Sequence, residues 1–286
     1  MPRLKLTLAY EGTRYAGWQI QAPPHPPTVQ GALEYALARM AGHRIPVLAA
    51  GRTDAGVHAE AQVCHLDLPE DRALPDLLFS LNALLPPDIR VLDAIPVASS
   101  FHARRDALGK CYAYSLWSGR RPPPPRVRAF VWHTENLDCA RMAEAAWFLE
   151  GRRDFASFRN KGGEEGRTVR TLRSLSLQPG GIGPLLCPED WPALTLVFEG
   201  DGFLKQMVRN LVGFLVFVGR NKLSPAEAPG ILAARDRRAL PSPTAPACGL
   251  TLMRILYACS AGTQPSADSE QPSCLLPGNH VKACVM

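Results

Sequence analysis

The spacing of apolar residues along this chain predicts the same order of strands and helices twice, once in each half. In the first half, alternating leucines at 4–8 predict a strand, and apolar residues at helical spacing predict a helix between Thr28 and Gly42. The other elements expected there are a helix at 74–85 and strands at 45–49, 62–67 and 89–95. Their order along the chain is β-α-β-β-α-β.

The second half repeats this order, with helices expected at 139–149 and 204–218 and strands at 110–117, 170–177, 194–199 and 250–258. Asp138 is suited to cap the first helix, and 224–227 forms a capping box that predicts another short helix. The repeated order is typical of the ferredoxin-like unit, in which helices cover one face of an antiparallel sheet. We therefore expect an α+β protein with two tandem ferredoxin-like halves, residues 1–107 and 108–259.

The composition is that of a globular protein with enough apolar material for a core, since 46% of the 286 residues are hydrophobic and 20% are charged. Lys and Arg outnumber Asp and Glu by 32 to 26, an excess that suits a polyanionic partner. The eight cysteines are scattered without a Cys-x-x-Cys pair, which favours free thiols in a reducing compartment.

The chain shows no sign of a membrane segment. No stretch approaches the ~20 apolar residues that cross a bilayer, and the N-terminus lacks the apolar core of a signal peptide. We therefore predict no membrane association and a cytoplasmic location. Residues 260–286 are rich in Ser, Gly, Pro and Gln with few large apolar side chains, which predicts a disordered tail.

One loop, at 50–59, has the sequence Ala-Gly-Arg-Thr-Asp-Ala-Gly-Val-His-Ala. Its two glycines allow a tight turn that presents Asp54. Arg52 and Asp54 are two positions apart, so they share one face of an extended segment. A neighbouring cation favours the ionised carboxylate, which suits a nucleophile better than a general acid. Taken alone, an Arg-x-Asp triplet is more often a polar turn whose Asp caps a backbone amide.

Six blocks, in order, resemble those of the tRNA pseudouridine synthase A family, and the similarity extends from about residue 4 to residue 257. The blocks are the loop itself, Tyr-Glu-Gly-Thr-Arg-Tyr-Ala-Gly-Trp-Gln-Ile-Gln at 10–21, Phe-His-Ala-Arg at 101–104, Lys-Cys-Tyr-Ala-Tyr at 110–114, Asp-Phe-Ala-Ser-Phe at 154–158 and Met-Val-Arg-Asn-Leu-Val-Gly at 207–213. A lone Gly-Arg-Thr-Asp would be a weak signal, but six ordered blocks are a strong one. The resemblance reverses the interpretation of Asp54 as a turn residue.

The resemblance implies an isomerase that converts uridine to pseudouridine at positions 38, 39 and 40 in the anticodon stem-loop of tRNA. It also implies halves related by a pseudo-twofold, with antiparallel sheets flanking a central cleft. The reaction breaks the C1′–N1 bond of a flipped-out uridine, rotates the base and rejoins it through C5, so neither cofactor nor metal is expected. Because relatives act as homodimers, we expect a homodimer that binds the anticodon arm of tRNA.

By the same resemblance, Asp54 is the essential nucleophile, and attack at C1′ of the sugar or at C6 of uracil both stay open. Tyr112 stacks on the flipped base or takes the C5 proton, the alternative being an aromatic residue of the strand core. Arg209 pairs with Asp54, because the apolar residues around it mark a buried segment where an unpaired cation is costly. Leu250 either packs against the base or belongs to the core.

Several cations are expected to contact RNA. Arg52 is expected to face the RNA beside Asp54, and Arg104 lies at the join between the halves. Lys110, Arg14 and the basic segment 151–168 are further candidates for contacts with the RNA backbone, which set register and bring salt dependence.

Three other assignments stay less specific. The basic, proline-rich loop 120–126 fits a spacer as well as a phosphate contact. His58 and His65 have no Cys or carboxylate at zinc spacing, so we expect both to be structural and no metal site.

Two other classes of function are alternatives. A non-catalytic RNA-binding protein can be built on the same sheet, with Asp54 as a turn residue only. A small-molecule hydrolase that uses Asp54 and His58 is disfavoured, because no loop offers an evident oxyanion site.

Overall fold

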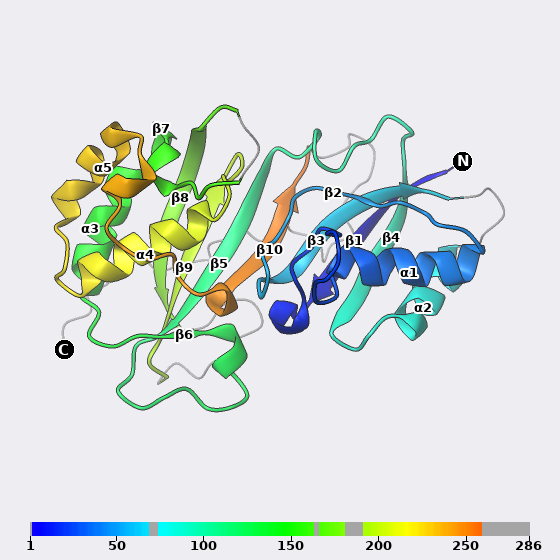
Figure 1. The fold of residues 1–286 in the computed structure, drawn as a ribbon, viewed down its shortest axis with the longest axis horizontal. Coiled ribbons are helices and arrows are strands. Elements are labelled where there is room, and N and C mark those ends of the chain that lie inside the picture. The colour runs from blue at the N-terminus through cyan, green and yellow to red at the C-terminus, as the bar shows by residue number, and fades with distance from the viewer. Residues whose placement is uncertain (1, 69–73, 163–165, 181–190, 259–286) are drawn as a thin grey trace, which may run out of the picture.

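One continuous sheet of ten strands runs through residues 2–68, 74–162, 166–180 and 191–258, which the computed structural model describes (Figure 1). The prediction of a disordered tail at 260–286 lies outside these residues. The strands are β1 (Arg3–Tyr10), β2 (Leu48–Ala49), β3 (His58–Asp67), β4 (Ile89–Val97), β5 (Gly109–Trp117), β6 (Trp132–His133), β7 (Gly151–Asp154), β8 (Val169–Pro179), β9 (Ala193–Gly200) and β10 (Leu250–Leu256). The α-helices in the same ranges are α1 (Val29–Ala41), α2 (Leu74–Leu84), α3 (Cys139–Leu149), α4 (Met207–Gly219) and α5 (Ala228–Ala234).

The strand order across the sheet is β4-β1-β3-β10-β5-β9-β8-β7, with β2 paired to β3 and β6 paired to β5. The two halves meet where β10 runs parallel to β3, with Thr251 opposite His58 and Leu252 opposite Ala59. The chain is thus a mixed α/β protein with one large sheet. This corrects the expectation of separate sheets on either side of a cleft.

The two halves can join into one sheet because strand β2 is short. A strand was expected at 45–49, but only Leu48–Ala49 pairs, and Pro46 lacks the backbone N–H that a ladder needs. Because β2 pairs only with Cys64 and His65 at the end of β3, the beginning of β3 keeps an open edge, which β10 occupies. Another difference is β7, which forms within the basic insertion expected at 151–168.

The predicted helices are confirmed, with small shifts at their ends. Thr28 caps α1 by accepting a hydrogen bond from the Gly31 N–H, and Gly42 ends that helix in the left-handed conformation. Asp138 caps α3, whose bounds match the prediction. The capping box at Ser224 leads through one 3₁₀ turn into α5.

The helices divide between the halves: Figure 1 shows α1 and α2 with β1, β3 and β4, and α3, α4 and α5 with β8 and β9. Every second side chain of β1 is buried, from Leu4 to Tyr10. In α4, eleven of the thirteen residues are buried. A helix that is apolar on nearly all sides belongs inside a core. Helix α4 is therefore the central helix of the C-terminal half.

The segment 242–246 crosses α4 at very short range. A Cβ added to Gly213 would lie only 2.1 Å from the carbonyl oxygen of Pro243, so glycine alone permits this approach. One turn earlier, the Ala245 N–H donates a hydrogen bond of 3.1 Å to the carbonyl oxygen of Arg209. The segment is thus fixed on the first two turns of α4.

Gly213→Ala should therefore lower the free energy of unfolding by about 1–3 kcal/mol, the usual cost of overpacking a filled core. Gly230→Ala in α5 is the matched control, because a Cβ there meets no atom within 4 Å and should stabilise the helix by up to about 1 kcal/mol. Urea unfolding followed by circular dichroism measures both variants. A Gly213→Ala protein as stable as the parent would contradict this packing.

Candidate active site

The loop between β2 and β3 that carries Asp54 is clamped by the segment after β1. The Trp18 N–H donates to the carbonyl oxygen of Thr53 at 3.1 Å, and the Gly56 N–H donates to that of Tyr15 at 3.3 Å. Gly17 has φ 93°, and a Cβ there would lie 2.5 Å from the Thr53 carbonyl oxygen. The two segments can approach this closely only because position 17 is glycine. Backbone contacts therefore hold the loop that presents Asp54.

Asp54 meets its cation across the join between the halves. Nη1 of Arg209, on the first turn of α4, lies 3.1 Å from Oδ2 of Asp54. The Nε of the same guanidinium donates to the carbonyl oxygen of Ala245 at 2.8 Å. The Asp54 side chain is 29% exposed and the Arg209 side chain 13%, so the carboxylate remains accessible while the guanidinium is largely enclosed. The structure brings these two predicted residues together.

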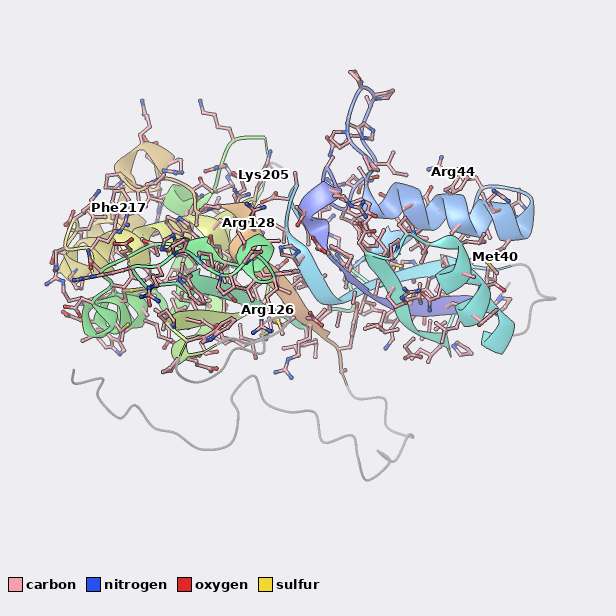
Figure 2. The ribbon with its side chains drawn as sticks, turned by 90° about the horizontal axis from the view of Figure 1, so that it is seen from below. Met40, Arg44, Arg126, Arg128, Lys205 and Phe217 are labelled. Atoms are coloured by element: carbon pink, nitrogen blue, oxygen red, sulfur yellow. The ribbon has the colours of Figure 1, made fainter. Side chains whose placement is uncertain are left out.

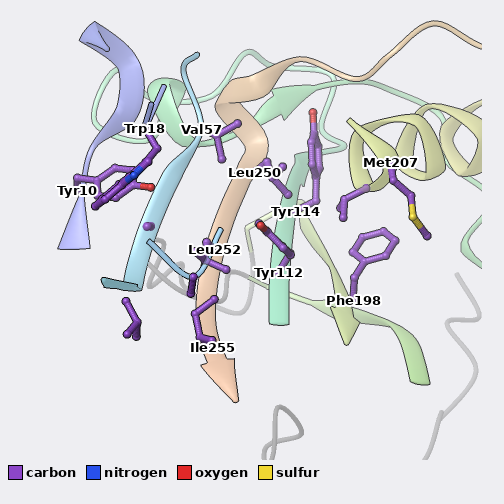
Figure 3. Packing of buried hydrophobic residues seen from close by; sticks show 14 of the residues in the cluster. Tyr10, Trp18, Val57, Tyr112, Tyr114, Phe198, Met207, Leu250, Leu252 and Ile255 are labelled. Carbon is purple, nitrogen blue, oxygen red and sulfur yellow. The ribbon is translucent and has the colours of Figure 1, made fainter. Parts of the chain in front are cut away.

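Tyr112 on β5 forms an aromatic surface near this pair. Its ring meets that of Phe203 edge-on, with centroids 5.3 Å apart. Burial, followed by the charges of Tyr10 and Asp54, raises the pKa of Tyr112, so its hydroxyl is protonated at neutral pH. Figure 3 shows Tyr112 and Tyr114 on β5 beside the leucines of β10.

Leu250 is buried on β10 and lies opposite Tyr114 in the strand register, while Leu252 lies opposite Tyr112. The structure thus places Leu250 two residue pairs along the ladder from the predicted stacking residue.

Sequence reasoning missed the part played by Tyr10. Its buried hydroxyl shares a hydrogen bond of 2.9 Å with Oγ1 of Thr53, the residue before Asp54. Burial raises the pKa of Tyr10, so this hydroxyl also keeps its proton. The available signal was that Tyr10 opens one of the six family blocks, although nothing in the sequence indicated its partner.

Lys110, at the start of β5, extends over the same loop. A Cβ added to Gly51 would lie 2.4 Å from its Nζ, so the ammonium group sits directly on the loop backbone. Burial, and then the charges of Arg104 and Arg170, lower the pKa of Lys110 to about 8. Arg52 and Arg104 are exposed. Two predicted cations, Arg104 and Lys110, therefore lie near Arg170 beside the loop, and the third, Arg52, is an exposed residue of the loop itself.

The remaining predicted residues are engaged elsewhere. Arg14 pairs with Asp88 at 2.6 Å. Nδ1 of buried His58 accepts the Gly12 N–H, and Nδ1 of buried His65 accepts the Ala103 N–H. Burial lowers the pKa of both histidines, in keeping with neutral, structural rings.

Two surveys cover the described residues only. In those ranges no three His, Cys, Asp or Glu side chains gather as metal ligands would. Nor does any helix of that part of the chain have both the length and the apolar character needed to cross a membrane.

Comparison with known proteins identifies the family of this chain. A family model described as tRNA pseudouridine synthase matches residues 7–106 and 145–258, which include Asp54 and Arg209, whereas Tyr112 lies between the two matched segments. The tRNA pseudouridine synthase A of Oleidesulfovibrio alaskensis is 50% identical over 275 residues, covering 90% of this chain and 97% of the relative. The proteins of the same name from Lawsonia intracellularis and Myxococcus xanthus are 48% and 44% identical over 260 and 258 residues, covering 90% of this chain in both cases and 100% and 92% of the relatives.

The surroundings of Lys110 predict a shifted titration. After reductive ¹³C-methylation, the Lys110 resonance should titrate with a midpoint at about pH 8, because burial and two guanidinium groups disfavour its charged form. The same resonance in the chemically unfolded protein is the control and should titrate near the ordinary lysine value.

The same shift has a consequence for stability. The folded state binds fewer protons than the unfolded state between the lowered and the ordinary pKa of Lys110, so this group favours folding increasingly as the pH rises from about 8. In Lys110→Met that contribution should be absent. A methylated Lys110 that titrates alike in the folded and the unfolded protein would contradict the placement of its ammonium on the loop.

Proposed function

Because the chain belongs to the tRNA pseudouridine synthase family, we propose that it isomerises uridine to pseudouridine in the anticodon stem-loop of tRNA, with Asp54 as the nucleophile. The positions expected from the family are 38, 39 and 40. The proposal is carried by the 3.1 Å ion pair between Asp54 and Arg209, next to the buried ring of Tyr112. A carboxylate paired with a cation beside an aromatic surface suits attack on a nucleoside.

Two routes for the carboxylate of Asp54 stay open. In the first, it bonds to C1′ and the C1′–N1 bond breaks, so that uracil leaves as an anion; after rotation C5 attacks C1′ and expels the carboxylate. In the second, the carboxylate adds to C6 before the C1′–N1 bond breaks, and it is expelled once C5 carries the sugar. On both routes C5 loses a proton and N1 gains one, so the product is an isomer.

Arg209 is proposed to hold the carboxylate in position. Its guanidinium contacts Asp54 through Nη1 and is anchored on the carbonyl oxygen of Ala245 through Nε. A guanidinium held at two of its three nitrogens has little freedom to turn away. The carboxylate is thereby held in one orientation before the uridine arrives.

Tyr112 is proposed to stack on the flipped uracil, with Leu250 packing nearby. Its raised pKa keeps the hydroxyl protonated, which favours stacking over removal of the C5 proton. Base–aromatic stacking contributes about 1–3 kcal/mol per base, comparable with the cost of extruding a nucleotide.

Arg52, Arg104 and Lys110 are proposed to bind the tRNA backbone around the extruded uridine. They carry positive charge beside the Asp54 loop, and Arg170 adds to it. Arg14 is the weaker candidate, because a phosphate there would compete with Asp88 for its guanidinium. Such contacts fix register and carry little sequence information.

We also infer that the halves are two ferredoxin-like units related by a pseudo-twofold. The strand orders β4-β1-β3-β2 and β10-β5-β9-β8 correspond to one another and support this assignment. A homodimer and a cytoplasmic location are proposed from the family resemblance alone.

Asp54→Asn should reduce tritium release from C5-labelled uridine in tRNA by at least about a thousandfold, because the amide is not a nucleophile. The affinity for tRNA should change little. Asp67→Asn is the matched control, since this exposed carboxylate of β3 pairs with Arg3 away from the loop. Release that survives Asp54→Asn would show that another group is the nucleophile, and no release by the wild type would favour the non-catalytic RNA-binding alternative.

Arg209→Ala should abolish turnover while the affinity for tRNA falls by less than about tenfold, because the guanidinium is tied to the carboxylate and largely enclosed. Arg220→Ala is the control at the other end of α4, where the side chain donates to the carbonyl oxygen of Glu135. Single-turnover rates and filter binding separate the two effects. If binding and turnover fell equally, Arg209 would belong to the RNA-binding surface instead.

A further inference from the structure

A basic cavity lies at the N-terminal end of α4, and its lining includes Lys161 from the basic segment 151–168. It has a volume of about 810 Å³, and its charged lining comes from three segments distant in the sequence: Lys161, Lys205, Asp236, Arg237 and Arg238. Lys205 is labelled in Figure 2. Four cations and one carboxylate leave the lining strongly positive, and the volume is that of an ordinary ligand pocket.

The single carboxylate is already engaged, because Arg238 Nη2 lies 2.8 Å from Asp236 Oδ2. Arg237 is half-buried, and its hydrogen-bond partners within the described ranges are neutral oxygens of Asn160, Leu240 and Ser242. Burial lowers the pKa of Arg237, the direction expected where no anion compensates the charge. Phosphate is an anion whose geometry matches the guanidinium fork of Arg, and Lys binds it as well.

The cavity shares one hydrogen-bonded frame with the active site. Asn160 accepts from Arg237 at 2.9 Å and from buried Asn210 at 3.0 Å. Thr244 donates to Oδ1 of Asn210 at 2.6 Å. Asn210 follows Arg209, and Thr244 precedes Ala245, on which Arg209 is anchored. An anion in the cavity is therefore held in fixed relation to the Asp54–Arg209 pair.

We propose that this cavity binds a backbone phosphate of the same tRNA whose uridine enters at Asp54. The inference rests on the proposed function, because it takes tRNA as the substrate. One phosphate held here fixes the distance from the backbone to the nucleophile, and so selects which nucleotide reaches Asp54. The cavity is a contact for RNA backbone and reads no base.

The test uses the full chain with Lys161→Gln and Lys205→Gln combined. Both lysines are exposed, and the Lys205 ammonium donates only a 3.3 Å hydrogen bond to the carbonyl oxygen of Gly162 within the described residues, so folding should be unaffected. The control combines Arg39→Gln with Lys222→Gln, which removes the same charge from exposed positions away from the cavity.

The dissociation constant for tRNA should rise about tenfold in the cavity variant, and the slope of log affinity against log salt should become shallower by about one. The control should match the wild type in both. Equal changes in the two variants, or none in either, would overturn the inference. So would loss of inorganic phosphate binding with tRNA binding unchanged, which would indicate a site for a small anion.

Failure of the proposed function is distinguishable from failure of this inference. Binding is measured without turnover, so the comparison can be repeated in an Asp54→Asn background. A wild type that releases no tritium rejects the proposed activity, whereas an active wild type with an unaffected cavity variant rejects only the phosphate site.

Discussion

The ion pair between Asp54 and Arg209 is the contact on which the active-site geometry depends. Asp54 belongs to a loop of the N-terminal half, and Arg209 belongs to the central helix of the C-terminal half. A 3.1 Å contact of this kind requires both halves to be fixed relative to each other. The sheet provides this, because β10 pairs with β5 of the C-terminal half on one side and with β3, directly after the loop, on the other. The pair is therefore a product of the whole fold.

Around this pair the protein concentrates positive charge. Lys110 and its arginine neighbours lie beside the loop of Asp54. The cavity that contains Arg237 lies at the N-terminal end of α4, the helix that carries Arg209. Burial, followed by the charges of Arg104 and Arg170, disfavours the charged form of Lys110, as its lowered pKa indicates. A polyanion bound there would favour the charged form, so the same electrostatics favour RNA.

Local features of the fold were predictable, while features formed between distant segments were not. Helix ends followed from capping residues such as Asp138 and Ser224, because a cap and its helix are adjacent in sequence. The pairing of β10 with β3 joins segments nearly two hundred residues apart, and no periodicity encodes it. For the site, the motif located Asp54 and the apolar surroundings of Arg209 indicated an acidic partner. The contacts of Tyr10 with Thr53 and of Lys110 with Gly51 needed coordinates, because sequence spacing carries no information on them.

The parallel ladder between β3 and β10 is only two residue pairs long, and it adjoins the loop of Asp54. The side chain of His58, which belongs to this ladder, links the two halves. That ring accepts the Gly12 N–H on one side, and its Nε2 lies 3.1 Å from the carbonyl oxygens of Ala129 and Cys248 on the other. This ring therefore contacts both halves only four positions after the nucleophile, so the join between the halves and the placement of Asp54 depend on the same side chain.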